Sequence, residues 1–88
     1  MEANKFTEKE IKILMEDKCT RAEAELHLKR GATIYEDLEE NLHKYMQEWE
    51  CDKGEIEAFK SMIETKIPII DWGVVVIKDK TYYIQYVL

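Results

Sequence analysis

The sequence has little of what marks disordered, fibrous or disulfide-bonded proteins. Its 88 residues include three glycines, one proline and two cysteines, while 45% are hydrophobic, so it is neither collagen-like nor a low-complexity segment. It also lacks a long hydrophobic run, because the longest apolar stretch, Val74 to Ile77, is far shorter than a membrane span. The sequence therefore predicts one globular domain, residues 1–88, with a modest core.

Nothing near the start of the sequence predicts export. The stretch from Met1 to Phe6 contains no apolar segment of the kind found in a signal peptide. We therefore expect a cytoplasmic protein that makes no contact with a membrane. In that compartment Cys19 and Cys51 are expected to remain thiols, although their even number leaves a disulfide as the alternative.

Positive charge is also scarce, since 13 Lys and Arg stand against 19 Asp and Glu and give a net charge of −6. Phosphate backbones are bound mainly by cations, so we expect no direct binding to nucleic acid. Residues 36–57 contain nine acids against two bases, a net charge of −7. We predict that this acidic surface attracts a basic protein partner through its long-range field, and a solvated helix face is the alternative. The acidic surface comprises Glu36, Asp37, Glu39, Glu40, Glu48, Glu50 and Asp52.

Four segments begin with an oxygen-bearing residue followed three positions later by glutamate, which is the spacing of a helix capping box. The pairs are Thr7 with Glu10, Thr20 with Glu23, Thr33 with Glu36, and Asp52 with Glu55. They predict helices over residues 7–18, 20–30, 33–50 and 52–65. The third has the clearest helical periodicity and should be the central packing helix, with Leu42 and Trp49 buried. Pro68 prevents the fourth from continuing.

Beyond Pro68, β-branched and aromatic residues dominate, and residues 73–88 are typical of a β-hairpin. We expect the stretch from Lys78 to Lys80 to supply its turn. A two-residue loop at Asp79 and Lys80 would place Ile77 opposite Tyr82, and a slip of one residue, which would exchange the faces, is the alternative. The fold class is therefore α+β, with about four helices followed by a C-terminal antiparallel β-hairpin.

Both faces of this predicted hairpin are apolar, whereas a ribbon that lies on one layer of helices buries only one face. The second face predicts a surface for forming a homodimer, unless the first helix wraps across it instead. Its residues are Trp72, Val74, Val76, Tyr83 and Val87.

No catalytic motif is present. Cys19 and His27 are eight residues apart, as are His43 and Cys51, and eight residues rise about 12 Å along a helix, too far to share a metal ion. A Cys-His nucleophile has no local motif in its favour. A helix-turn-helix through Gly31 is disfavoured because acids occupy the would-be recognition helix. We expect no enzymatic activity, no cofactor and no metal.

Several stretches resemble small uncharacterised acidic proteins carried on mobile elements and phages of gut bacteria. They are Arg21 to Glu25, Gly31 to Leu42, Asp71 to Gly73, Lys80 to Ile84 and Tyr86 to Leu88. The resemblance covers most of the chain after residue 20 and brings no catalytic motif or established activity. It implies a setting in which small acidic proteins often inhibit nucleic-acid enzymes by occupying their basic grooves, as some anti-CRISPR proteins do. We therefore expect a non-enzymatic interaction module or inhibitor, and the alternative is a structural homo-oligomer assembled through the hairpin.

Overall fold

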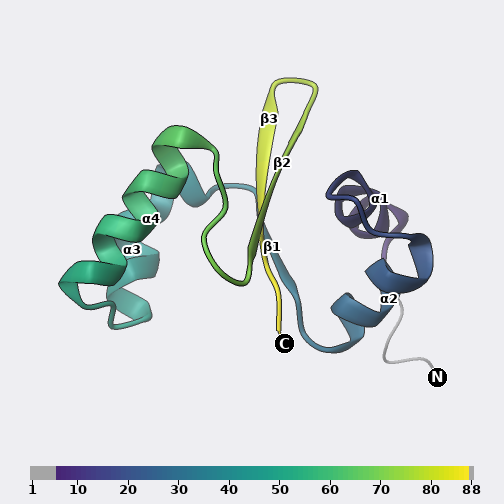
Figure 1. The fold of residues 1–88 in the computed structure, drawn as a ribbon, viewed down its shortest axis with the longest axis horizontal. Coiled ribbons are helices and arrows are strands. Elements are labelled where there is room, and N and C mark those ends of the chain that lie inside the picture. The colour runs from purple at the N-terminus through teal and green to yellow at the C-terminus, as the bar shows by residue number, and fades with distance from the viewer. Residues whose placement is uncertain (1–5, 88) are drawn as a thin grey trace.

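A three-stranded antiparallel sheet lies between two pairs of helices in the computed structural model, which describes residues 6–87 (Figure 1). The chain is α+β, with four helices followed by a C-terminal antiparallel hairpin, as the sequence predicted. The elements in chain order are α1 (Glu8–Glu16), α2 (Arg21–Lys29), β1 (Thr33–Tyr35), α3 (Leu38–Glu48), α4 (Lys53–Thr65), β2 (Trp72–Ile77) and β3 (Lys80–Gln85). Residues 1–5 and Leu88 lie outside the described residues. The expectation about the start of the sequence and the last residue of the predicted hairpin fall there.

Three of the four predicted capping boxes begin helices. The side chains of Thr7, Thr20 and Asp52 each accept a hydrogen bond from the backbone N–H three residues later. The glutamate at that position accepts a hydrogen bond from the cap's own N–H in return. These reciprocal bonds satisfy donors that the first turn of a helix leaves without partners, and they position α1, α2 and α4.

The predicted helix over residues 33–50 is wrong at its start, because Thr33–Tyr35 forms the unpredicted strand β1. Two β-branched residues and a tyrosine favour extended backbone, and pairing with β3 satisfies that backbone, with Ile34 opposite Ile84. The capping-box spacing of Thr33 and Glu36 is therefore coincidental. The helix itself begins at Leu38.

The sheet order is β1-β3-β2, so the last strand is central. The hairpin turn consists of Lys78 and Asp79, both with positive φ, and Ile77 lies opposite Lys80. The turn therefore lies within the predicted stretch from Lys78 to Lys80, but the register that a loop at Asp79 and Lys80 would give, with Ile77 opposite Tyr82, is not the one observed. Two consecutive positive φ values are typical of the turn that matches the twist of a hairpin, and aspartate tolerates that conformation. The register differs by two residues, and because side chains alternate with that period, each residue keeps its predicted face.

The chain's own helices cover both faces of the sheet, which corresponds to the alternative in which a helix of the same chain, rather than a second chain, covers the second face. One core cluster joins α1 and α2 to the face that carries Val75, Tyr82 and Ile84. The other joins α3 and α4 to the face that carries Trp72 and Tyr83. The sequence left the second face unpartnered because it assigned the helices to a single layer.

Within α3 the buried residues are Leu38 and Met46, whereas Leu42 and Trp49, predicted to be buried, are half-buried. Asn41 interrupts the helix, with φ −119° and ψ 20°. A helical periodicity counted over one continuous helix does not allow for this break. It therefore misidentifies which apolar side chains of α3 are the most buried. None of the described helices is both long enough and apolar enough to cross a membrane.

Candidate functional site

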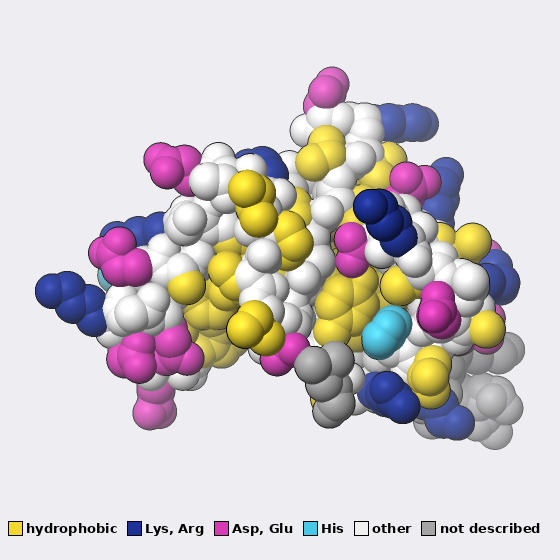
Figure 2. All heavy atoms as spheres, in the orientation of Figure 1, with side chains coloured by type: hydrophobic (Ala, Val, Ile, Leu, Met, Phe, Trp, Pro, Cys, Tyr) yellow, Lys and Arg dark blue, Asp and Glu magenta, His cyan; other side chains and the backbone are white. Residues whose placement is uncertain are grey.

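The acidic surface occupies both ends of α3 rather than one continuous face. The helix has 11 residues and therefore spans about 16 Å between its ends. The α3-start group comprises Glu36, Asp37, Glu39 and Glu40, and the α3-end group comprises Glu48, Glu50 and Asp52. Figure 2 shows acidic side chains gathered over the outer end of the α3–α4 pair, at the lower left of the view.

Glu36 lies between lysines from two distant elements. Its carboxylate is 2.9 Å from the Lys80 amine of β3 and 3.4 Å from the Lys9 amine of α1. The hydrogen bond from Lys80 is the main reason that the pKa of Glu36 lies below its usual value. Glu36 therefore links α1, the hairpin and the start of α3, and part of its charge is neutralised inside the molecule.

Glu39, on α3, connects that helix to the end of its neighbour α4 and to the central strand β3. Its Oε2 atom lies 2.6 Å from the Lys66 amine, just after α4, and accepts a 2.7 Å hydrogen bond from the Tyr83 hydroxyl of β3. The bond from Lys66, followed by that from Tyr83, lowers the pKa of Glu39. Burial and the same carboxylate raise the pKa of Tyr83. The pair is a hydrogen-bonded anchor between α3 and the sheet.

Asp37 is bonded within its own neighbourhood. It accepts hydrogen bonds from the Tyr45 hydroxyl at 3.0 Å and from the Asn41 amide at 3.1 Å. Glu40 differs, since it is exposed and makes no ion pair or side-chain hydrogen bond within residues 6–87. Of the α3-start group, Glu40 therefore presents the carboxylate most available to another molecule.

The α3-start group lines a hollow of about 230 Å³ together with the tip of the hairpin. Asp79, Lys80 and Thr81 complete its wall. Sequence reasoning missed these three residues because they follow the α3-start group by 39 to 45 positions and reach it only through the β1–β3 pairing. The hollow is acidic with one lysine, which suits a cationic side chain better than an anion.

The α3-end group is more open. Glu48 and Glu50 are exposed, and within the described part of the chain neither side chain has an ion-pair or hydrogen-bond partner. Asp52 has a structural role, because its carboxylate caps α4 by accepting the Glu55 N–H at 2.8 Å. The acidic surface thus divides into carboxylates that hold the fold together and three, Glu40, Glu48 and Glu50, that face solvent.

The predicted oligomer surface is largely inside the protein. Trp72 and Tyr83 are buried in the cluster with α3 and α4, and Val74 is half-buried beside them. Val76 and Val87 remain exposed, at 58% and 43% of their surface. These five residues therefore do not form one exposed apolar face.

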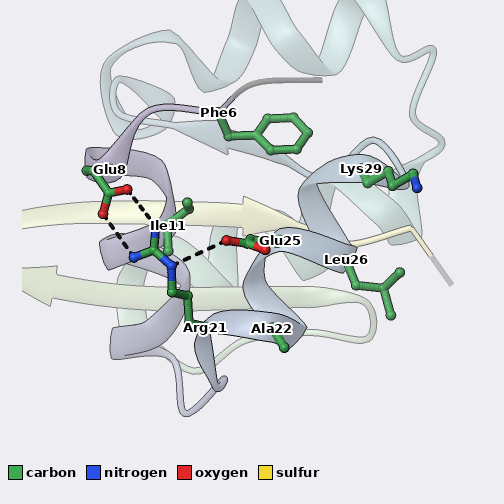
Figure 3. Close-up of a pocket in the computed structure, with 8 residues that line it drawn as sticks. All are labelled: Phe6, Glu8, Ile11, Arg21, Ala22, Glu25, Leu26 and Lys29. Atoms are coloured by element: carbon green, nitrogen blue, oxygen red, sulfur yellow. Dashed lines mark hydrogen bonds and ion pairs between the residues drawn. The ribbon is translucent and has the colours of Figure 1, made fainter. Parts of the chain in front are cut away.

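A larger hollow, of about 530 Å³, lies between α1 and α2, away from the acidic surface (Figure 3). Its apolar lining comes from Phe6, Ile11, Ala22 and Leu26. Along one side, Arg21 pairs with Glu8 at 2.6 Å and with Glu25 at 3.3 Å. With Lys29, the lining carries two positive and two negative charges, so the larger hollow offers neither a concentrated field nor a nucleophile paired with a base.

Groups that could hold a metal or act as a nucleophile are not assembled in the described residues. Residues 6–87 contain no set of three or more His, Cys, Asp or Glu side chains placed to bind a metal ion. Cys19 packs against the α1–α2 cluster and Cys51 against the α3–α4 cluster, on opposite sides of the sheet. Both are free thiols, and burial raises the pKa of each, which disfavours the reactive thiolate.

No protein-family model, curated protein or solved structure matches this chain.

Proposed function

We propose that the protein acts by association, docking its exposed carboxylates on a basic, nucleic-acid-binding surface of a partner protein and inhibiting that partner. The observation that carries the proposal is the division within the acidic surface. Glu36, Asp37 and Glu39 are held by internal bonds, whereas Glu40, Glu48 and Glu50 face solvent without internal partners among the described residues.

Rigid placement supports this function. The fold already fixes the backbone that carries these carboxylates, so no segment has to be ordered on binding, and a fixed pattern of charge steers a basic partner into one orientation. Glu48 and Glu50 also work against local stability, because negative charge at the C-terminal end of a helix opposes the helix dipole. Exposed acids at that position are better explained by an external cation than by the stability of α3.

The setting of the proposal follows from the resemblance to small acidic proteins of mobile elements and phages. In that setting the protein would work in the cytoplasm, without catalysis or a cofactor, as an anti-CRISPR-like inhibitor of a nucleic-acid enzyme. Its net charge of −6 matches a target whose own site binds phosphates.

The test begins with tagged protein used to capture partners from source cells at low salt. The captured protein is then purified, and its association rate is measured at about 50 and 300 mM salt, because screening weakens steering between exposed charges. We expect a basic partner that loses nucleic acid as this protein is added. A partner that binds nucleic acid equally well in its presence would contradict inhibition.

A pair of charge-matched variants locates the surface. Glu48→Lys combined with Glu50→Lys should slow association at least tenfold, whereas Glu16→Lys combined with Glu64→Lys changes the net charge equally but lies away from the α3-end group. Replacing Glu48 by lysine favours the helix dipole, so slower association would not reflect loss of α3. Equal rates for the two double variants would contradict the proposed surface.

A further inference from the structure

The strand β2 has an open edge with unpaired backbone groups. Ile77 and Lys80 flank the two-residue turn, so the backbone groups of Ile77 and Val75 point toward β3, and those of Val74 and Val76 point away. The N–H of Trp72 points the same way as the latter two, and it donates to the Ile69 carbonyl at 3.0 Å. Within the described chain no such bond from a turn or loop reaches Val74 or Val76.

This edge lacks the usual protection of an exposed strand. Edge strands are commonly short, interrupted by proline, or marked with charge. The opposite edge, β1, has three residues, whereas β2 has six and contains neither proline nor charge. Its Val76 side chain is 58% exposed. Figure 2 shows further hydrophobic side chains exposed over the connection between α4 and β2, which includes Ile67 and Ile70.

We propose that β2 pairs antiparallel with β2 of a second copy of this chain, across a twofold axis at Val75, to form one continuous six-stranded sheet. In this register Val74 of each copy lies opposite Val76 of the other. Each such pair exchanges two backbone hydrogen bonds, so all the outward groups of both residues are satisfied. The arrangement is independent of the proposed docking of carboxylates on a basic partner.

The geometry of the edge favours a second copy in this register. A twofold axis at Val74 would require the backbone N–H of Trp72, which Ile69 already occupies. An axis at Val75 requires only the outward backbone groups of Val74 and Val76, and these are free within the described chain. One symmetry operation then completes the edges of both chains, which is how most closed dimers are built.

Charged residues of opposite sign flank the edge. Asp71 precedes β2 and Lys78 follows it, both are exposed, and neither forms an ion pair within residues 6–87. In this register Asp71 of each copy lies opposite Asp79 of the other, and Lys78 lies one position away, so the lysine offsets part of the repulsion between the two carboxylates. Between these ends β2 is uncharged, so two chains that each carry −6 meet where their repulsion is weakest.

Sedimentation equilibrium tests the assembly, with amide hydrogen exchange as a second measurement. We expect a concentration-dependent dimer of twice the 10.5 kDa chain mass and slow exchange of the Val74 and Val76 amides in the dimer. Val76→Lys should weaken self-association at least tenfold, and Val87→Lys, the same change at an exposed valine outside β2, should leave it unaltered. Circular dichroism of both variants verifies folding.

Three results would overturn the proposal. One is a strict monomer at high micromolar concentration, and a second is a dimer in which both amides exchange rapidly. The third is a monomer whose Val74 and Val76 amides become protected only with a different protein, which would assign the edge to that protein. The exchange measurement uses the unmodified chain, so it tests the proposal even if a variant fails to fold.

Discussion

The hydroxyl of Tyr83 donates a 2.7 Å hydrogen bond to Glu39 and so ties the central strand to the start of α3. A similar bond lies on the other face of the sheet, where the Tyr86 hydroxyl donates to Asp17 at 2.6 Å, just after α1. Each helix pair is therefore fastened to the sheet by one tyrosine and one carboxylate. A charged acceptor makes such a bond stronger than one between neutral groups.

Removing the Tyr83 hydroxyl should measure the strength of this anchor. Tyr83→Phe is expected to lower the free energy of unfolding by about 1 to 2 kcal/mol, because a partly buried bond to a charged acceptor is lost. Tyr82→Phe is the matched control, since the Tyr82 hydroxyl makes no hydrogen bond within the described chain. Urea denaturation would compare the two, and equal losses would show that the bond to Glu39 contributes nothing specific.

Gly73 lies directly beside the hydrogen bond between Asp17 and Tyr86, and a side chain there should disrupt that bond. A Cβ atom at Gly73 would collide with the Asp17 carboxylate and lie 3.0 Å from the Tyr86 ring. We expect Gly73→Ala to destabilise by about 1 to 3 kcal/mol. The same change at Gly54, which is exposed in α4, should be neutral or stabilise by up to about 1 kcal/mol.

Combining Gly73→Ala with Asp17→Ala provides a further control, because the second change removes the group that the new methyl meets. The losses of unfolding free energy in the two single variants should sum to more than the loss in the double variant, as expected for residues in contact. Strict additivity in thermal or chemical denaturation would contradict the proposed collision.

Leu38 and Leu42 should differ in their contribution to the core. Leu38 is fully buried, so Leu38→Ala is expected to cost about 2 to 5 kcal/mol through lost burial and the cavity left behind. Leu42 is half-buried, and Leu42→Ala should cost clearly less. Equal or reversed losses in chemical denaturation would mean that α3 packs through a different face.

Stability should fall in acid because of Glu36 and Glu39. Their lysine partners lower the pKa of both carboxyl groups below the usual 4.5, so each favours the folded state at higher pH. This contribution is present above pH 4.5 and is lost as the pH falls through the lowered values. The urea midpoint should therefore decline progressively as the pH falls below about 5.

A variant that carries Glu36→Gln and Glu39→Gln should show a shallower decline over the same range. Glu57→Gln serves as the control, because Glu57 is exposed within α4 and has no ion-pair or side-chain hydrogen-bond partner in the described chain. If stability fell equally steeply with pH in the double variant and in the unmodified protein, the ion pairs of Glu36 and Glu39 would not be the cause of the loss in acid.

The local signals in the sequence were sufficient for most of the fold. Thr7, Thr20 and Asp52 begin helices as predicted, because a capping box depends only on residues within one turn. The hairpin and the α+β class follow from β-branched and aromatic residues after Pro68. The strand at Thr33–Tyr35 was missed because it is stable only when paired with β3, a partner that no local spacing reveals.

The candidate site was only partly accessible to the same reasoning. The sequence locates the acidic residues, but it does not show that Lys9, Lys66 and Lys80 approach two of them from other elements. It also treated Trp72 and Tyr83 as available for oligomer contacts, although α3 and α4 bury them. These errors share one cause, since each depends on contacts between residues far apart in the chain.

The central position of β3 determines when the protein can fold during its synthesis. This strand supplies Tyr82 and Ile84 to one core cluster and Tyr83 to the other, and it follows every other described helix and strand in chain order, so a ribosome makes it after them. Until it emerges, neither pair of nascent helices has the sheet against which to bury its apolar side. Such long-range contacts, like that from Tyr35 to Gln85 50 residues later, slow folding. Both halves of the core should therefore form together, in a single late step.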